Sequence, residues 1–332
     1  MTRRYRRLIR LLHPDTAPPG RAAEAAAACS TLNTLRHEQP APDPDTLTTP
    51  QYRYTLRLDT IAGATISGDL ALLRRATAAP HRDPLADDLD VLLKTPRSPA
   101  DNDLMEREAT ALVRLARHGD PRFHAYVPTL VESFTTTTTT TTGTTGTAGP
   151  DSVRRVNALR RLDGFHPLTA LAEARPEGLD ARDAAWIWRR LLVALGYAHR
   201  AGVRHGAVHP EHVLVHPEYH GVVLVDWCYS VTGPPAPLPA LVERHRHNYP
   251  PEVLAREPAT EATDLHLATR CMADLMGDQA PRELRAFIAG CTLPAEPRRP
   301  HDAWRLLAEL DDLLDRRYGP RTFRPFHLPG TS

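Results

Sequence analysis

Residues 202–228 read GVRHGAVHPEHVLVHPEYHGVVLVDWC and form the most informative part of this 332-residue chain. Two short apolar runs, HVLV from His212 and GVVLVD from Gly221, have the length and the β-branched content of strands. A histidine-rich loop precedes the first run, and Asp226 ends the second. This part of the chain therefore predicts two short strands bordered by polar loops.

The same residues resemble two protein-kinase motifs, the catalytic loop H-R-D-L-K-P-E-N and the strand and D-F-G element that follow it. His205 matches the loop histidine, and Asp226 matches the D-F-G aspartate, which binds a metal ion in that family. The resemblance extends over residues 52–315, with the motifs in the family's order. Three further matches imply structural residues: Glu252 in the segment like A-P-E, Asp264 at the start of a helix, and the late Arg299.

Lys94 is the single lysine among 41 basic residues, and it ends the apolar run VLL. Lysine is a compact point charge and arginine a planar fork, so neither replaces the other at a site shaped for one of them. The position resembles the kinase strand lysine that contacts ATP phosphates, and Glu108 in REATALVRL matches the helix glutamate that pairs with it. The alternative is an ion pair that only braces the structure.

The loop departs from the kinase pattern where the chemistry takes place. Ala207 stands at the aspartate that accepts the substrate proton, and Gly206 at the arginine of H-R-D. His209 stands at the loop lysine, and His212 at the asparagine that holds a second magnesium ion. Phosphoryl transfer needs base, metal ions and lysine together, and alanine accepts no proton. The resemblance thus implies a pseudokinase with a degenerate loop at His205, Ala207, His209 and His212.

Residues 63–70, GATISGDL, resemble the glycine-rich loop that covers the phosphates in kinases, with Thr65 at the middle glycine. A β-branched residue at that position hinders close approach of the backbone to a phosphate. The implied nucleotide site, with ATP as its ligand, consists of Gly63, Gly68, Lys94 and Glu108. The implied Mg²⁺ ligand is Asp226.

Histidines recur closely enough in this region to raise the question of a zinc site, at positions His205, His209, His212, His216 and His220. Their spacing crosses a loop and two predicted strands, so the imidazoles are not expected to converge. A neighbouring group of cysteines or carboxylates that would complete a ligand set is also missing from the sequence pattern. We therefore interpret these histidines as structural.

The N-terminal segment predicts two helices around a break. Tyr5, Leu8, Ile9 and Leu12 form an apolar stripe on a basic helix, which His13-Pro14-Asp15 ends, and an alanine-rich helix follows at 22–35. This arrangement resembles the second helix, the HPD loop and the third helix of J-domain co-chaperones. The resemblance implies that His13, Pro14 and Asp15 contact a heat-shock chaperone ATPase.

Composition shifts divide the chain into five parts. We predict a J-domain-like helical hairpin over residues 1–37, a proline-rich linker over 38–51 and a tail over 317–332. Between them we predict an α+β, bilobal kinase-like fold. Its strand-rich N-lobe covers residues 52–163, with a threonine-rich loop at 135–147, and its helical C-lobe covers 164–316.

Bulk properties restrict the partners and the compartment. The formal net charge of +1 gives no electrostatic case for a nucleic acid or a membrane surface as partner. The longest apolar runs fall short of the roughly 18 residues that a bilayer span needs. The four cysteines are far apart and form no CxxC pair, which favours reduced thiols and a cytoplasmic location.

These patterns predict a nucleotide-binding pseudokinase that acts as a regulator or scaffold for an unidentified protein partner, with a possible link to chaperones. Two alternatives stay open at this point. One is an active, atypical serine/threonine protein kinase, and the other is a J-domain co-chaperone adaptor.

Overall fold

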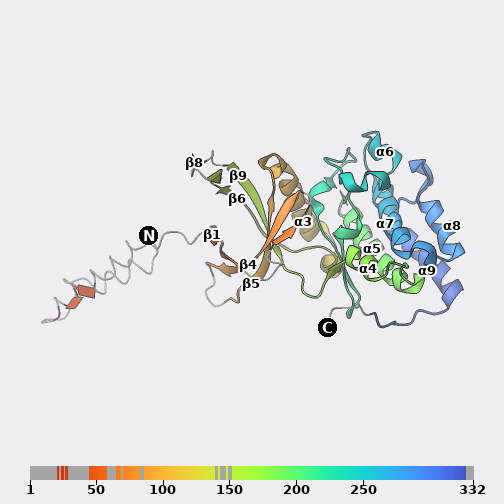
Figure 1. The fold of residues 1–332 in the computed structure, drawn as a ribbon, viewed down its shortest axis with the longest axis horizontal. Helices are drawn as coiled ribbons and strands as arrows, with labels where there is room; N and C mark the ends of the chain where they lie inside the picture. The colour runs from red at the N-terminus through yellow and green to blue at the C-terminus, as the bar shows by residue number, and fades with distance from the viewer. Residues whose placement is uncertain are drawn as a thin grey trace.

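The computed structural model describes residues 21, 24–25, 27–28, 45–57, 65–68, 70–82, 86–138, 141–142, 147–148 and 152–326. Strands dominate the described chain up to residue 160, and helices dominate it from residue 168 (Figure 1). The predicted chaperone-contact residues His13, Pro14 and Asp15 and the predicted nucleotide-loop residue Gly63 lie outside the described residues.

An antiparallel sheet in the order β1-β2-β4-β5-β9-β6, with β3 paired to β4, makes up the strand-rich part. The strands are β1 (Thr46–Thr48), β2 (Tyr52–Leu56), β3 (Thr65–Ser67), β4 (Ala71–Pro80), β5 (Leu89–Pro96), β6 (Leu130–Thr138) and β9 (Ser152–Arg160). Alternating residues share one face, which buries Tyr54, Ala76, Ala78, Val91, Leu93, Val156 and Ala158. The alternate residues of the same strands therefore face the other side of the sheet. Lys94, next to Leu93 in β5, is one of them.

Helix α3 (Asn102–His118) lies between the sheet and the helical part (Figure 1). One side of the helix is apolar and buried, at Leu104, Ala111, Leu112 and Leu115. Asn102 fastens the start of the helix to β9, because its side chain donates to Val153 O at 2.9 Å and accepts from Arg155 N at 2.8 Å. This attachment fixes which residues α3 presents toward Lys94.

The helical part is built around α5 (Ala181–Arg200), which is buried along an apolar stripe from Ala184 to Ala198. The other helices are α4 (Leu168–Ala174), α6 (Pro251–Leu254), α7 (Glu261–Met276), α8 (Arg282–Cys291) and α9 (Ala303–Tyr318). Two small antiparallel sheets join them: β10 (His166–Pro167), β12 (Val213–His216) and β13 (Gly221–Leu224), and β11 (Val203–Arg204) with β14 (Val231–Thr232). Strands β12 and β13 are the two predicted from HVLV and GVVLVD.

Two predictions about local structure are wrong. Strand β1 lies inside the predicted linker 38–51 and pairs with β2. The predicted threonine-rich loop begins too early, because Thr135–Thr138 continue β6 and pair with Arg155 to Ser152 of β9. Threonine is β-branched and favours a strand once a partner strand supplies the hydrogen bonds. Two further short strands, β7 (Thr141–Thr142) and β8 (Thr147–Ala148), pair with each other.

Within the described part of the chain, none of the helices has the length and apolar character needed to cross a bilayer.

Candidate functional site

Four parts of the chain bring their side chains together on one face of the sheet. Lys94 comes from β5, and Asn157 of β9 stands directly opposite it in the strand register. Glu108 comes from α3, and Asp226 and Cys228 come from the segment that follows β13. The structure thus assembles the predicted residues Lys94, Glu108 and Asp226 in one place.

The Lys94 ammonium is enclosed and fully engaged. Its Nζ donates to Glu108 Oε1 at 2.8 Å, to Asp226 Oδ1 at 2.8 Å and to Cys228 Sγ at 3.1 Å. The side chain is only 4% exposed. Burial on its own would lower the pKa of Lys94, but Asp226, Cys228 and Glu108 outweigh it and hold the pKa well above the usual value. Lys94 is therefore a permanent cation inside the protein.

The carboxylate oxygen of Glu108 that does not contact Lys94 is also hydrogen-bonded. Its Oε2 accepts a hydrogen bond from Asn157 Nδ2 at 2.9 Å, and the same amide nitrogen donates to Met105 O at 2.9 Å. The Glu108 side chain is 0% exposed. Both carboxylate oxygens are thus used, so the position of Glu108 is fixed by α3, β5 and β9 together.

Asp226 stands between Lys94 and the histidine loop. It adopts a left-handed backbone conformation (φ 65°, ψ 61°), which turns the chain sharply after β13. Its Oδ2 lies 3.4 Å from His212 Nε2, on the side away from Lys94. Burial opposes ionisation, but Lys94, His212 and a hydrogen bond from the Cys228 thiol overcome it and lower the pKa of Asp226. The carboxylate is ionised and has a cation beside it.

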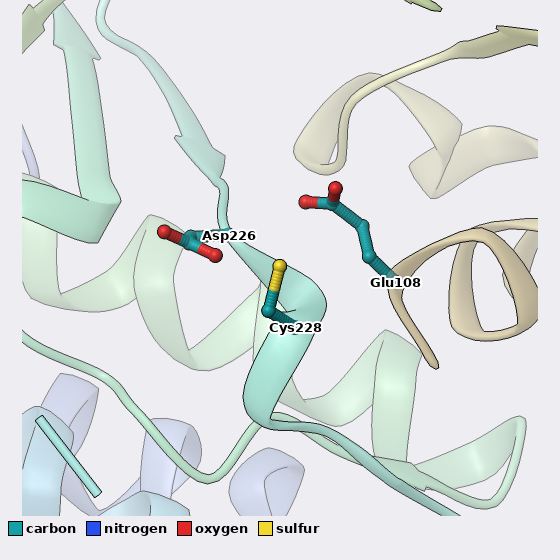
Figure 2. Close-up of side chains that lie close together, drawn as sticks. All are labelled: Glu108, Asp226 and Cys228. Atoms are coloured by element: carbon teal, nitrogen blue, oxygen red, sulfur yellow. The ribbon is translucent and has the colours of Figure 1, made fainter. Parts of the chain in front are cut away.

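The acidic and thiol groups of this cluster form a potential metal-binding set. Figure 2 shows Glu108 reaching from α3 toward Asp226 and Cys228. One oxygen of each carboxylate and the sulfur lie within 4.8 Å of one another. Lys94 Nζ, however, is in hydrogen-bond contact with all three atoms. The ammonium therefore already supplies the positive charge that a metal ion would bring to this point.

Ala207, at the position of the kinase base, is packed into apolar surroundings. It is fully buried in a cluster that we name the cleft cluster, which consists of Ala71, Leu104, Met105, Ala207, Cys228, Tyr229 and Val242, with Leu70 and Ala240 packed against it. These residues come from β4, α3 and the segment after Asp226. The position that should present a base to a substrate is thus covered by hydrocarbon.

His209 is enclosed too. It is 1% exposed, stacks on His245 at a ring distance of 4.5 Å and meets Tyr249 edge-on. Its Nε2 finds no hydrogen-bond partner among the described residues. Burial, with His212 and His245 nearby, lowers the pKa of His209 to about 2. The ring is therefore neutral and shielded, which is a poor setting for a group that would have to take the proton that Ala207 cannot accept.

Gly206 explains why the arginine of H-R-D has no counterpart here. Its φ of +76° lies in the left-handed region. A Cβ atom at this position would come within 2.6 Å of Leu238 Cδ2 and 2.8 Å of Tyr229 O. Because Leu238 and Tyr229 occupy this space, an arginine does not fit without rebuilding the segment after Asp226.

The predicted structural residues lie in buried polar contacts of the helical part. Asp264 accepts hydrogen bonds from the backbone N–H groups of His205 and Gly206, both at 2.8 Å, and lies 2.9 Å from His199 Nε2. Glu252 receives Arg299 Nη2 at 2.5 Å. The histidine loop is thus fastened to α7, and α6 to the chain before α9.

The predicted glycine loop is partly a hairpin. Thr65–Ser67 form β3 and pair with Leu72 to Arg74 of β4. The turn closes with Gly68 N donating to Ala71 O at 2.9 Å, and Arg97 Nε donates to Gly68 O at 3.1 Å. Leu70 at this turn reaches the cleft cluster. Gly68 therefore lies in a turn whose backbone oxygen and N–H are both hydrogen-bonded.

Two residues of the site were not predicted, Cys228 and Asn157. Cys228 stands at the glycine of the D-F-G-like element, so its side chain was a visible departure from the motif. Asn157 has no comparable signal in the sequence. Its contact with Glu108 depends on the pairing of β5 with β9, which brings distant parts of the chain together.

The buried histidines predict a loss of stability in mild acid. Burial lowers the pKa of His205 to about 4 and that of His209 to about 2, both below the ordinary value near 6.5. Below pH 6.5 these histidines therefore bind protons in the unfolded chain but not in the folded chain, so the free energy of unfolding falls as the pH falls. Each of these histidines should remove about 1 kcal/mol of stability per pH unit between pH 6 and 5, and the contribution of His205 should fade toward pH 4, where its folded-state pKa lies.

His209→Phe removes one titrating histidine, so it should reduce the dependence of stability on pH by the contribution of His209. Stability near pH 7 should be kept, because phenylalanine can stack on His245. Urea denaturation at pH 7, 6 and 5 measures the slope. His247→Phe, at an exposed position, is the matched control. An unchanged slope in His209→Phe would show that His209 does not stay neutral when folded.

Comparison with solved structures identifies the fold. The crystal structure of the BubR1 kinase domain superposes with a TM-score of 0.57 and 12% sequence identity, over 88% of this chain and 92% of that chain. No protein-family model matches the sequence. No curated protein matches it significantly either. The chain therefore has a protein-kinase-like fold, with a mixed α/β architecture and a sequence far from that of the similar structure.

Proposed function

We propose that this protein is a pseudokinase, in which the strand-rich and helical parts act as the two lobes of a kinase that does not transfer phosphate. The observation that carries the proposal is the burial of Ala207 in the cleft cluster. An alanine accepts no proton, and apolar side chains surround it where a substrate hydroxyl would need a polar partner. The role of the protein is then to regulate or scaffold a protein partner. We propose a cytoplasmic location for it.

The proposal includes a nucleotide site, because the charged residues of the cleft are those that would hold phosphates. Lys94 would contact the phosphates, and Glu108 would keep Lys94 in position. Bound ATP with Mg²⁺ would supply a charged ligand that bridges the two lobes. The site would accommodate it only by opening the contacts that now surround Lys94.

The fit to magnesium is poorer than the fit to a phosphate. Mg²⁺ requires oxygen ligands in octahedral geometry. Asp226 offers a carboxylate, but one oxygen contacts Lys94 and the other lies 3.4 Å from His212 Nε2. His212 places nitrogen where the kinase pattern has an amide oxygen. The site thus suits at most one magnesium ion, held through Asp226, and this also argues against efficient phosphoryl transfer.

We expect phosphotransfer to remain at background. The test is incubation of the purified chain with γ-labelled ATP and Mg²⁺, scoring both self-labelling and labelling of peptide libraries. Asp226→Asn, which removes the proposed metal ligand, provides the background level. Incorporation in the wild type well above that of Asp226→Asn would overturn the proposal. Loss of such incorporation in His209→Ala would further identify the protein as an atypical kinase.

A further inference from the structure

The hydrogen-bonding capacity of Lys94 is exhausted within the protein. An ammonium has three N–H donors and no acceptor. Two donors go to the carboxylates of Glu108 and Asp226, and the third goes to the Cys228 sulfur at 3.1 Å. With the side chain 4% exposed, solvent contributes little. A phosphate oxygen that is to bind Lys94 must therefore displace one of these three acceptors.

The three acceptors differ in how easily a phosphate oxygen could displace them from Lys94. Glu108 is braced by Asn157, and an oxygen of the Asp226 carboxylate lies 2.8 Å from the ammonium. Charge-assisted hydrogen bonds of this kind are roughly twice as strong as neutral ones. The third acceptor is the Cys228 sulfur, at 3.1 Å from Nζ. A neutral thiol is a weak acceptor, and it is the group with which a phosphate would compete.

The sulfur cannot simply swing away. Cys228 is fully buried, in the 3-10 turn Trp227–Tyr229, and belongs to the cleft cluster. Leu104 and Met105 of α3 pack in the same cluster, and dense packing leaves few alternative rotamers. Moving the thiol would also give up its hydrogen bond to Asp226. Packing therefore keeps a weak acceptor permanently in the place that a phosphate needs.

We propose that Cys228 sets the nucleotide affinity of this site. It holds Lys94 in a self-contained cluster, so that nucleoside triphosphates bind weakly until the thiol is removed or displaced. The proposal rests on the nucleotide site proposed above. It attributes the weak nucleotide binding that we expect of the wild-type chain to the Cys228 side chain. The glycine that Cys228 replaces in the D-F-G-like element would leave one Lys94 donor unpaired.

Two substitutions at one position separate this role from simple packing. Cys228→Ala removes the acceptor, and ATP should bind about tenfold more tightly, because a hydrogen bond to a charged group is worth about 1.5 kcal/mol or more. Cys228→Ser restores an acceptor of similar size, so its affinity should stay at or below that of the wild type. ATP affinity is measured by calorimetry, with Mg²⁺ and with EDTA. Melting curves establish that each variant is folded.

Cys291→Ala is the matched control, since it also shortens a buried thiol but lies at the end of α8, away from the sheet (Figure 1). It should leave ATP affinity unchanged. If Cys228→Ala does not fold, Cys228→Gly takes its place. Equal, measurable affinity in the wild type and Cys228→Ala would refute the role of Cys228 and leave the nucleotide site intact. Absence of ATP binding in every variant, with all of them folded, would refute the nucleotide site itself.

Discussion

Replacing Lys94 by alanine should lower the free energy of unfolding by about 3 to 5 kcal/mol, because it leaves two neighbouring carboxylates without their cation. Glu108 is 0% exposed and Asp226 26% exposed, and both contact the ammonium at 2.8 Å. The loss does not come from a strong net attraction in the wild type. It comes from the cost of burying unpaired negative charge once the partner is gone.

The measurement is urea denaturation of the wild type, Lys94→Ala and a surface control. Arg57→Ala breaks the Arg57–Asp90 ion pair, which has a similar distance of 2.7 Å but side chains that are 45% and 43% exposed. Exposed pairs contribute about 1 kcal/mol or less, so this control should change stability little. If Lys94→Ala is no less stable than Arg57→Ala, the carboxylates are not held as a buried charged pair.

Lys94→Arg distinguishes a fitted ammonium site from a simple brace. Arginine keeps the charge but brings a larger planar group with five donors. Glu108, Asp226 and Cys228 surround a single nitrogen, and the side chain they enclose is 4% exposed. We expect Lys94→Arg to recover only part of the lost stability and none of the ATP binding. An arginine variant equal to the wild type in both would mean that only the charge at this position matters.

The charged residues of the site could be predicted because each lies in a short motif. Lys94 ends a strand, Glu108 lies on a regular helix and Asp226 follows a strand, so local patterns were enough to assign them. Their contacts with one another depend on the fold, which the kinase resemblance implied. Strand β1 was missed because TLT is too short to carry a periodic signal, and it is a strand only through its pairing with β2.

The closure of the cleft could not be predicted from the sequence. From the local sequence, Ala207 predicts the loss of a base and nothing about its surroundings. Its burial depends on Leu70, Met105 and Val242, which lie far from it in the chain and far from one another. Non-local apolar contacts of this kind have no local pattern, and they change the interpretation of the loop. A carboxylate restored at this position would stand among apolar side chains, which oppose its ionisation.

The histidine loop keeps its shape through Asp264, so Asp264→Ala should be among the most damaging single changes, with a loss of about 3 to 5 kcal/mol. The carboxylate is 0% exposed and accepts the backbone N–H groups of His205 and Gly206 at 2.8 Å each. Buried donors without acceptors cost about 1 to 3 kcal/mol apiece. Release of these two amides would also free Ala207 from the cleft cluster.

Asp264→Asn should fall between the wild type and Asp264→Ala. An amide keeps one acceptor oxygen for one of the two N–H groups but points its own NH₂ at the other. Burial opposes ionisation of Asp264, yet hydrogen bonds from His199 and Gly206 keep its pKa below the usual value. Its stabilising effect is therefore present above pH 4 and lost as the pH falls below that, so the gap between aspartate and asparagine should narrow in acid.

Asp274→Asn is the matched control for this series. It makes the same change on the same helix, but its carboxylate is 49% exposed and 3.8 Å from Arg270. Its stability should stay within about 0.5 kcal/mol of the wild type. Hydrogen exchange of the His205 and Gly206 amides provides a local readout, since both should exchange much faster in Asp264→Ala and one of them in Asp264→Asn. Wild-type exchange at both amides, together with wild-type stability, would show that α7 does not hold the loop, and the closed cleft would then need another anchor.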